Sequence, residues 1–155
     1  ILTSYYYSMK YSHPLSKHND FSRQMILNAR KRANKLTIDE YVLQLIPRYK
    51  RTYEKYATHV LGKPNVCFVK YEQLVTDKRA WLQHIVSYLQ LPILDSDADA
   101  ILEDTDFSVL EESVHSHKRQ VTPGDHLRKL KPETIEKLNE ELGDTLRKFN
   151  YSVPA

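Results

Sequence analysis

Glycine, cysteine and long apolar runs are scarce in this sequence of 155 residues, and each scarcity excludes a class of protein. The three glycines, Gly62, Gly124 and Gly143, lie too far apart to form a glycine-rich phosphate loop. The single cysteine, Cys67, excludes an intrachain disulfide and favours a cytoplasmic location, although a glycosylation sequon at 150–152 leaves a secretory one open. No run approaches the roughly 20 apolar residues that span a bilayer, so we expect no membrane partner.

Metal-site and hydrolase signatures are missing as well. His115 and His117 stand two residues apart, but no further ligand has convincing zinc-site spacing with them. No Gly-x-Ser-x-Gly turn marks a nucleophilic serine. The 11 tyrosines recur at helical spacing, which is more typical of core and interface residues than of a platform for stacked bases. We therefore expect neither a metal ion nor a nucleic acid as a ligand.

Helical periodicity covers most of the chain. The polar stretch at 15–36 carries only a weak helical pattern and can equally be a surface excursion, and residues 113–130, with Pro123-Gly124, are predicted to form a loop. Pro47 predicts a break, because proline lacks the amide donor of a helix interior. The predicted helices are at 1–12, in two pieces at 37–62 after a Thr37–Glu40 capping box, at 82–89, in one or two pieces at 95–112, and at 132–149.

One segment has the pattern of a strand. Val66-Cys67-Phe68-Val69 is short, apolar and rich in residues that favour β structure, which is typical of a strand buried on both faces of a parallel sheet. A predicted helix follows it, and a strand followed by a helix is half of a βαβ unit. The sequence therefore predicts one α/β domain over residues 1–155, mostly helical by content, with one buried parallel strand.

Several segments carry a more specific signal through their order along the chain. These are Leu-Thr-Ser-Tyr-Tyr-Tyr at 2–7, Val-Cys-Phe-Val-Lys-Tyr-Glu-Gln-Leu at 66–74, Thr-Asp-Phe-Ser-Val-Leu at 105–110, Arg-Gln-Val-Thr-Pro-Gly-Asp-His at 119–126 and Leu-Lys-Pro-Glu at 130–133. Together they resemble, over nearly the whole chain, the cytosolic-type sulfotransferases that use 3′-phosphoadenosine-5′-phosphosulfate (PAPS). The resemblance implies the C-terminal part of a P-loop-like sulfotransferase domain.

The resemblance also implies which residues bind the donor. It gives Ser4 and Arg119 to the 3′-phosphate, Tyr71 and Phe107 to the adenine with Thr105 beside them, and Gln120 and Gly124 to the phosphate-binding loop. A planar guanidinium suits this task because it can grip a phosphate with two hydrogen bonds. From the residues alone, Arg119 can also be a solvated loop charge, and Tyr71 and Phe107 can be core aromatics.

Four positions depart from the family's pattern. Gln120 stands for a lysine, Val121 for a glycine, His126 for a tryptophan and Lys131 for a threonine. A valine in place of a glycine restricts how closely the backbone can approach a phosphate at that point.

The implied activity is transfer of a sulfuryl group from PAPS to a hydroxyl or amine of a small-molecule acceptor, leaving 3′,5′-adenosine bisphosphate. In the family the catalytic lysine and histidine lie upstream of the segment that Ile1 begins, so we assign no catalytic residue and expect the 155 residues alone to be inactive. Residues 13–36 are the candidate acceptor loop. A non-catalytic nucleotide-binding or interaction domain that needs a partner chain, a helical scaffold without a ligand, and a homodimer remain open alternatives.

Overall fold

The computed structural model describes residues 1–104, 109, 111–116 and 119–153, and the regular structure within them is helical. No helix among these residues is both long enough and apolar enough to cross a membrane. The elements are α1 (Leu2–Tyr7), the π-helical turn η1 (Ser8–Ser12), α2 (Asp20–Lys35), α3 (Ile38–His59), α4 (Tyr71–Thr76), α5 (Lys78–Leu89), α6 (Asp95–Asp104), α7 (Asp125–Lys129) and α8 (Pro132–Lys148).

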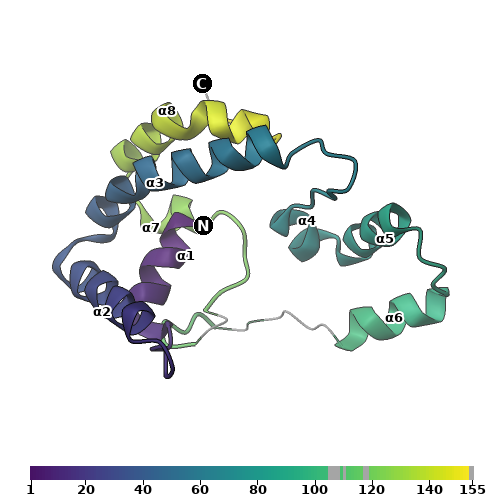
Figure 1. Ribbon diagram of the computed structural model, residues 1–155, viewed down its shortest axis with the longest axis horizontal. Helices are drawn as coiled ribbons and strands as arrows, with labels where there is room; N and C mark the ends of the chain where they lie inside the picture. The colour runs from purple at the N-terminus through teal and green to yellow at the C-terminus, as the bar shows by residue number, and fades with distance from the viewer. Residues whose placement is uncertain (105–108, 110, 117–118, 154–155) are drawn as a thin grey trace.

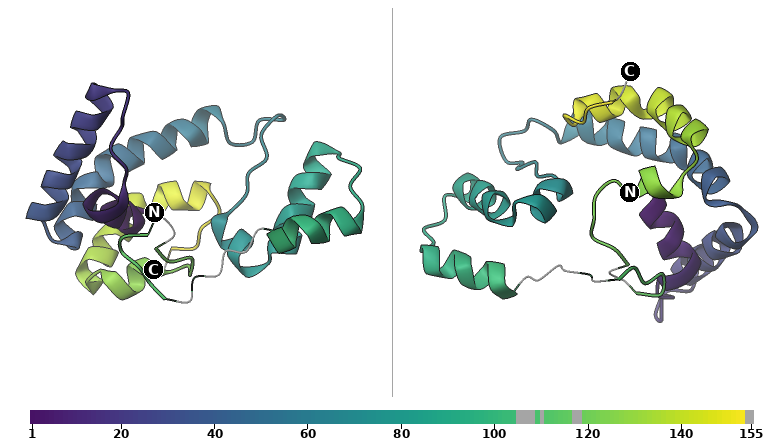
Figure 2. Two further views of the ribbon diagram at one scale, coloured as in Figure 1. Left: turned by 90° about the horizontal axis from the view of Figure 1, so that it is seen from below. Right: turned by 180° about the vertical axis from the view of Figure 1, so that it is seen from behind.

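The helices form a packed body and an arm (Figure 1). In the body, α3 and α8 lie side by side, α1 packs against α3 and α7, and α2 packs against η1 and α3. The arm consists of α4, α5 and α6, which contact one another in sequence and lie to one side of the body in both views of Figure 2. Polar contacts join the arm to the body, among them a 2.6 Å hydrogen bond from Lys70 Nζ to the carbonyl oxygen of Asn150.

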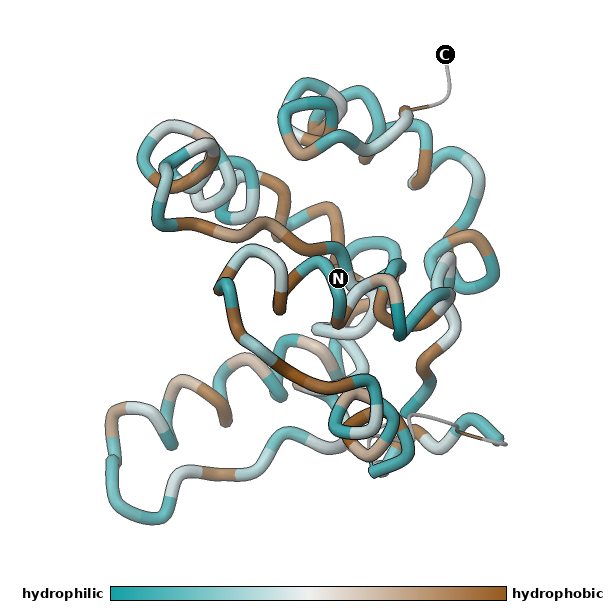
Figure 3. The backbone as a smooth tube through the Cα atoms, turned by 90° about the vertical axis from the view of Figure 1, so that its right-hand side faces the viewer, coloured by the Kyte–Doolittle hydropathy of each residue, from teal (hydrophilic) through white to brown (hydrophobic). Residues whose placement is uncertain are grey.

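Helix α3 is the centre of the body because two of its faces are apolar. One face packs Tyr41 and Leu45 with Tyr6 and Ala33, and the other packs Val42 and Ile46 with Leu130 and Leu138. Such a wide apolar stripe lets one helix bury residues against neighbours on both sides. Figure 3 shows the corresponding alternation of hydrophobic and hydrophilic positions along the helices.

The predicted break at Pro47 is wrong, since α3 continues through it. Pro47 is exposed to solvent, so water can satisfy the carbonyl group that the missing amide leaves unpaired. Contacts with α8 hold the helix on either side of this position, since Val42 and Ile46 pack against Leu138 before it and Lys50 Nζ lies 3.9 Å from Glu141 Oε2 after it. The start of α3 was predicted correctly: the Glu40 amide donates to Thr37 Oγ1 at 3.3 Å, and the Thr37 amide donates to Glu40 Oε2 at 2.8 Å.

The predicted α/β class is also wrong, because the described residues contain no strand or sheet. Val66–Val69 is without regular secondary structure, and the backbone N–H and C=O groups of Cys67, Phe68 and Val69 make no hydrogen bond among the described residues. A strand exists only through hydrogen bonds to a neighbouring strand, and residues 66–69 form no such ladder with any other described segment. The apolar side chains pack instead onto the body, with the Phe68 ring 5.6 Å from that of Phe149.

Candidate functional site

The site is centred on Arg119, which is only 8% exposed. Its guanidinium forms ion pairs with two carboxylates, those of Glu112 and Asp125. Asp125 is the first residue of α7, and the turn before it is made by Gly124 at φ +76°, a conformation in which glycine is strongly favoured. The loop therefore folds back on itself and holds the arginine inside the protein.

Tyr7 and Lys129 complete the cluster around Arg119. The guanidinium carbon lies 4.2 Å from the centroid of the Tyr7 ring, within the range of a cation–π contact. Lys129 lies at the end of α7, and its Nζ donates to Glu112 Oε2 at 2.8 Å. These contacts join the first helix of the chain to the loop that precedes α7.

The charges in this cluster perturb one another. The hydrogen bond from Lys129 lowers the pKa of Glu112 below its usual value of 4.5, and the hydrogen bond from Arg119 adds to this effect while partial burial opposes it. Burial alone would lower the pKa of Arg119, but its hydrogen bonds to Asp125 and Glu112 raise it. The ion pairs of Glu112 with Lys129 and with Arg119 are therefore between charged partners at neutral pH.

Asp125 has an oxygen that is not fully satisfied. Its Oδ2 pairs with Arg119, whereas Oδ1 is buried without a hydrogen-bond partner among the described residues. Nη2 of Arg128 lies 3.6 Å from that oxygen, close enough for an ion pair but too far for a hydrogen bond. In the described part of the chain, the side chains of Arg119, Arg128 and Lys129 thus form ion pairs with two carboxylates, those of Glu112 and Asp125.

Comparison with protein families identifies the chain. The family model described as "Sulfotransferase domain" matches residues 1–149, a range that includes both Tyr7 and the Arg119 loop. The chain belongs to the sulfotransferase family. No curated protein and no solved structure matches it significantly. Membership supports a transferase activity in general terms, and the family generally uses PAPS as its sulfuryl donor.

Besides Arg119 itself, three of the predicted donor-binding residues of this sulfotransferase lie in or against the Arg119 loop, and Gly124 makes the turn that ends it. Tyr71 is the first residue of α4, in the arm, and its hydroxyl donates to the carbonyl oxygen of Val121 at 3.1 Å. Gln120 is within the loop and donates from Nε2 to the carbonyl oxygen of Thr122 at 3.4 Å. Tyr71 is 49% exposed, so it is not a core aromatic. Arg119 is buried, so it is not a solvated loop charge.

The other predicted residues are placed less directly. Ser4 is exposed on α1, one turn before Tyr7 and therefore on the same side of the helix. The contacts of the Arg119 guanidinium are to Glu112, Asp125 and the Tyr7 ring, so a shared ligand of Ser4 and Arg119 stays a prediction. Thr105 and Phe107 lie outside the described residues.

Sequence reasoning missed Tyr7, Glu112 and Lys129. Tyr7 carries a signal in its spacing, since it follows Ser4 by three residues on a predicted helix. Glu112 and Lys129 carry none, because each is an ordinary charged residue until the fold brings it to Arg119. The helix α7 was missed as well, because its five residues are too few for a periodic pattern.

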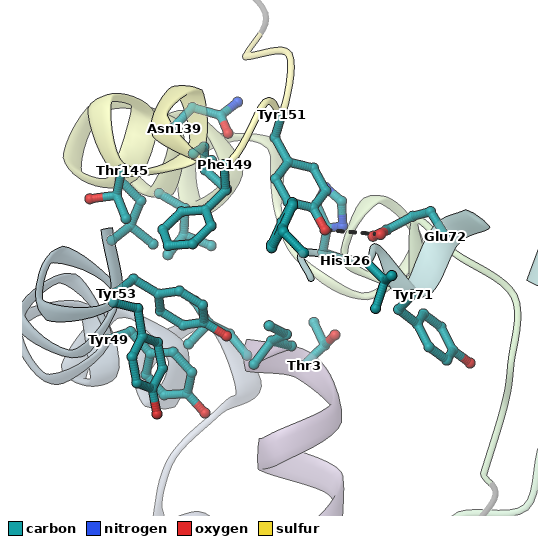
Figure 4. A pocket seen from close by; sticks show the side chains of 18 of the residues that line it. Thr3, Tyr49, Tyr53, Tyr71, Glu72, His126, Asn139, Thr145, Phe149 and Tyr151 are labelled. Carbon is teal, nitrogen blue, oxygen red and sulfur yellow. Dashed lines mark hydrogen bonds between the residues drawn. The ribbon is translucent and has the colours of Figure 1, made fainter. Parts of the chain in front are cut away.

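A second feature of the sulfotransferase chain is an apolar cavity of about 700 Å³ between α3, α8 and the segment 66–69. Figure 4 shows Tyr49 and Tyr53 of α3 on one side and Phe149 on the other, and the Tyr53 and Phe149 rings are 5.6 Å apart. None of the lining residues comes from 13–36, the candidate acceptor loop, which is largely the helix α2.

One polar pair lies at the edge of this cavity. The hydroxyl of Tyr151 donates to Glu72 Oε2 at 2.9 Å, as the dashed line in Figure 4 marks. Burial, together with this hydrogen bond to a carboxylate, raises the pKa of Tyr151 to about 12. The tyrosine is therefore a hydrogen-bond donor at neutral pH. No group of three or more metal-ligating side chains occurs in the described part of the chain.

Proposed function

We propose that this chain binds the 3′-phosphoadenosine part of PAPS, or of 3′,5′-adenosine bisphosphate, for sulfuryl transfer to a hydroxyl or amine of a small-molecule acceptor. The observation that carries the proposal is the setting of Arg119, held between Asp125 and the Tyr7 ring in a chain of the sulfotransferase family. A guanidinium fixed on one edge and one face can present its remaining N–H groups to a phosphate.

The residues present fit a phosphate group. The Glu112 carboxylate accepts from both Arg119 and Lys129, and this pairing of two cations with one anionic group supports the proposal. Ser4, one turn before Tyr7, supplies a hydroxyl on the same side of α1. Gly124 permits the sharp turn that returns the chain to Asp125.

The adenine contacts belong to Tyr71, Thr105 and Phe107 in this proposal. Tyr71 is half-exposed, and its hydroxyl is anchored to the loop that contains Arg119, so its ring is available beside the phosphate site. An aromatic ring fixed in this way can pack against a purine base. The family resemblance assigns Thr105 and Phe107 to the same adenine site.

The roles of these residues are binding and orientation. In the reaction the acceptor oxygen or nitrogen forms a bond to sulfur, the bond from sulfur to the donor's phosphate oxygen breaks, and the acceptor proton passes to a base. We assign neither that base nor a cation for the leaving oxygen to any described residue, and we propose that the 155 residues alone do not turn over. Holding the 3′-phosphoadenosine is what fixes the position of the reacting end.

Titration calorimetry with 3′,5′-adenosine bisphosphate tests the proposal. Arg119→Ala is expected to abolish detectable binding, and Arg119→Lys to weaken it by about tenfold or more because the ammonium cannot form the bidentate contact. The control is Arg147→Ala, which removes an exposed arginine paired with Asp144. Equal affinities of the wild type and Arg119→Lys, with both folded by circular dichroism, would contradict the proposal.

A second candidate function is a non-catalytic interaction domain completed by another chain. The apolar cavity beside 66–69 and the unbonded backbone groups of Cys67, Phe68 and Val69 favour it. These backbone groups belong to half-buried residues, and burying such a group is costly unless water or another chain satisfies it. Sedimentation velocity that shows concentration-dependent association, combined with no nucleotide binding by the wild type, would favour this function over the first.

A further inference from the structure

Glu112 bridges two cations that come from different segments. Its Oε1 pairs with Nη1 of Arg119, and its Oε2 accepts from Nζ of Lys129 at 2.8 Å. Arg119 belongs to the loop before α7 and Lys129 to the last turn of α7. One internal carboxylate therefore holds a guanidinium and an ammonium at a separation that suits a single anion with two or more oxygens.

The two carboxylates at Arg119 differ in how firmly they are held. The Asp125 side chain is 10% exposed and lies in the first turn of α7, where a negative charge is favoured by the helix dipole. The Glu112 side chain is 29% exposed and comes from a segment without helix or strand. Asp125 is thus the fixed partner of Arg119, and Glu112 is the partner that can leave by side-chain rotation.

The backbone next to Glu112 can stay in place when its side chain moves. The amide of Ser113 donates to the carbonyl oxygen of Arg119 at 3.1 Å, which ties the two segments together independently of the ion pair. A glutamate side chain has three rotatable bonds, so its carboxylate can turn to solvent without a change in this backbone contact.

We infer that Glu112 occupies the place of the ligand's phosphate when no ligand is bound, and that Lys129 is the second cation of that phosphate site. This inference rests on the proposed function and names a binding residue that the sequence motifs do not include. A phosphate dianion carries more charge than a carboxylate and has three acceptor oxygens, so it can take the N–H groups of both Arg119 and Lys129. Glu112 is then an internal competitor of the ligand.

The inference predicts opposite effects of two substitutions on calorimetric affinity for 3′,5′-adenosine bisphosphate. Glu112→Gln removes the competing charge and is expected to tighten binding by about tenfold, whereas Lys129→Met removes a phosphate contact and is expected to weaken it by about tenfold. Glu140→Gln and Lys137→Met are the matched controls, because this pair is exposed on α8 and is expected to leave affinity unchanged. Thermal unfolding checks that each variant is folded. If Glu112→Gln is not folded, Glu112→Ala is measured in its place.

The outcomes separate this inference from the proposed function. If the wild type binds the nucleotide and Glu112→Gln binds it equally or more weakly, the inference is overturned and the nucleotide function stays intact. The same holds if Lys129→Met binds the nucleotide as tightly as the wild type does. Inorganic pyrophosphate serves as a second probe. If pyrophosphate follows the predicted order and the nucleotide does not bind, the two-cation site stands and the nucleotide function falls. If neither probe binds the wild type, both are overturned.

Discussion

The guanidinium carbon of Arg119 lies 4.2 Å from the centroid of the Tyr7 ring, and this contact joins the Arg119 loop to the first helix of the chain. The arginine is buried, and its remaining partners are the carboxylates of Glu112 and Asp125. A ring on one face and a carboxylate on one edge fix the plane of the guanidinium. The geometry of the proposed phosphate site therefore depends on Tyr7 as well as on the loop.

Replacing Tyr7 tests that dependence. Tyr7→Leu removes the ring and is expected to weaken binding of 3′,5′-adenosine bisphosphate by about threefold to tenfold, because a partly buried cation–π contact contributes about 1 kcal/mol. Tyr7→Phe keeps the ring and should retain nearly all of the affinity. Calorimetric titration of the two variants makes the comparison, and an equal loss in both would show that the hydroxyl rather than the ring matters.

Replacing Arg119 should also lower the free energy of unfolding. Arg119→Ala leaves the buried Asp125 carboxylate without its main partner, and breaking such a pair typically costs about 3 kcal/mol. Arg147→Ala breaks an exposed pair with Asp144 and should cost less than about 0.5 kcal/mol. Urea unfolding measures both changes.

A double variant identifies the cause of that loss. In Arg119→Ala combined with Asp125→Ala, no charge remains buried without a partner, so stability should partly recover relative to Arg119→Ala alone. Additive losses from the two substitutions would show that the ion pair is not the source of the effect.

The lowered pKa of Glu112 predicts how its contribution to stability depends on pH. Because the carboxylate is more acidic in the folded chain than its usual value of 4.5, its contribution is present above that pH and is lost as the pH falls through the folded value. The stability difference between the wild type and Glu112→Gln should therefore be largest near neutral pH and shrink below about pH 4.5. Urea unfolding from pH 3 to pH 7 measures it, and a difference that does not change with pH would contradict the ion pairs.

Two phenylalanines provide a matched test of the packing beside the cavity. Phe149 is 8% exposed and contacts the rings of Tyr53 and Phe68, whereas Phe21 on α2 is 76% exposed. Phe149→Ala is expected to lower the free energy of unfolding by about 3 kcal/mol, and Phe21→Ala by less than about 0.5 kcal/mol. Chemical denaturation measures the free energy of unfolding of both variants. Similar small losses in the two would mean that Phe149 is not part of a packed core.

Local sequence patterns predicted the helices that carry strong local signals. The Thr37–Glu40 capping box begins α3, and Pro132 is the first residue of α8, as expected of a residue with no amide to donate. The prediction of a break at Pro47 was wrong because packing on both sides of the proline outweighs the loss of one hydrogen bond. The prediction of a strand at Val66–Val69 was wrong. An apolar run is compatible with a strand, but a strand also needs a neighbouring strand to which its backbone can hydrogen-bond.

The candidate site was predictable only in part. The order of the motifs indicated Arg119 and the family, and the family match over residues 1–149 confirms the latter. The partners of Arg119 were not predictable, since Tyr7, Glu112 and Asp125 reach it only through the tertiary fold. The roles of Ser4, Tyr71, Thr105, Phe107, Gln120 and Gly124 in donor binding stay predictions.

The central claim is that this chain recognises the 3′-phosphate of the donor nucleotide, and a comparison of two ligands by titration calorimetry tests it most directly. The ligands are 3′,5′-adenosine bisphosphate and 5′-adenosine monophosphate, which differ only in that phosphate. The account predicts that the bisphosphate binds the wild type at least about tenfold more tightly and that Arg119→Lys removes most of this preference. Equal affinities of the wild type for the two nucleotides would contradict it.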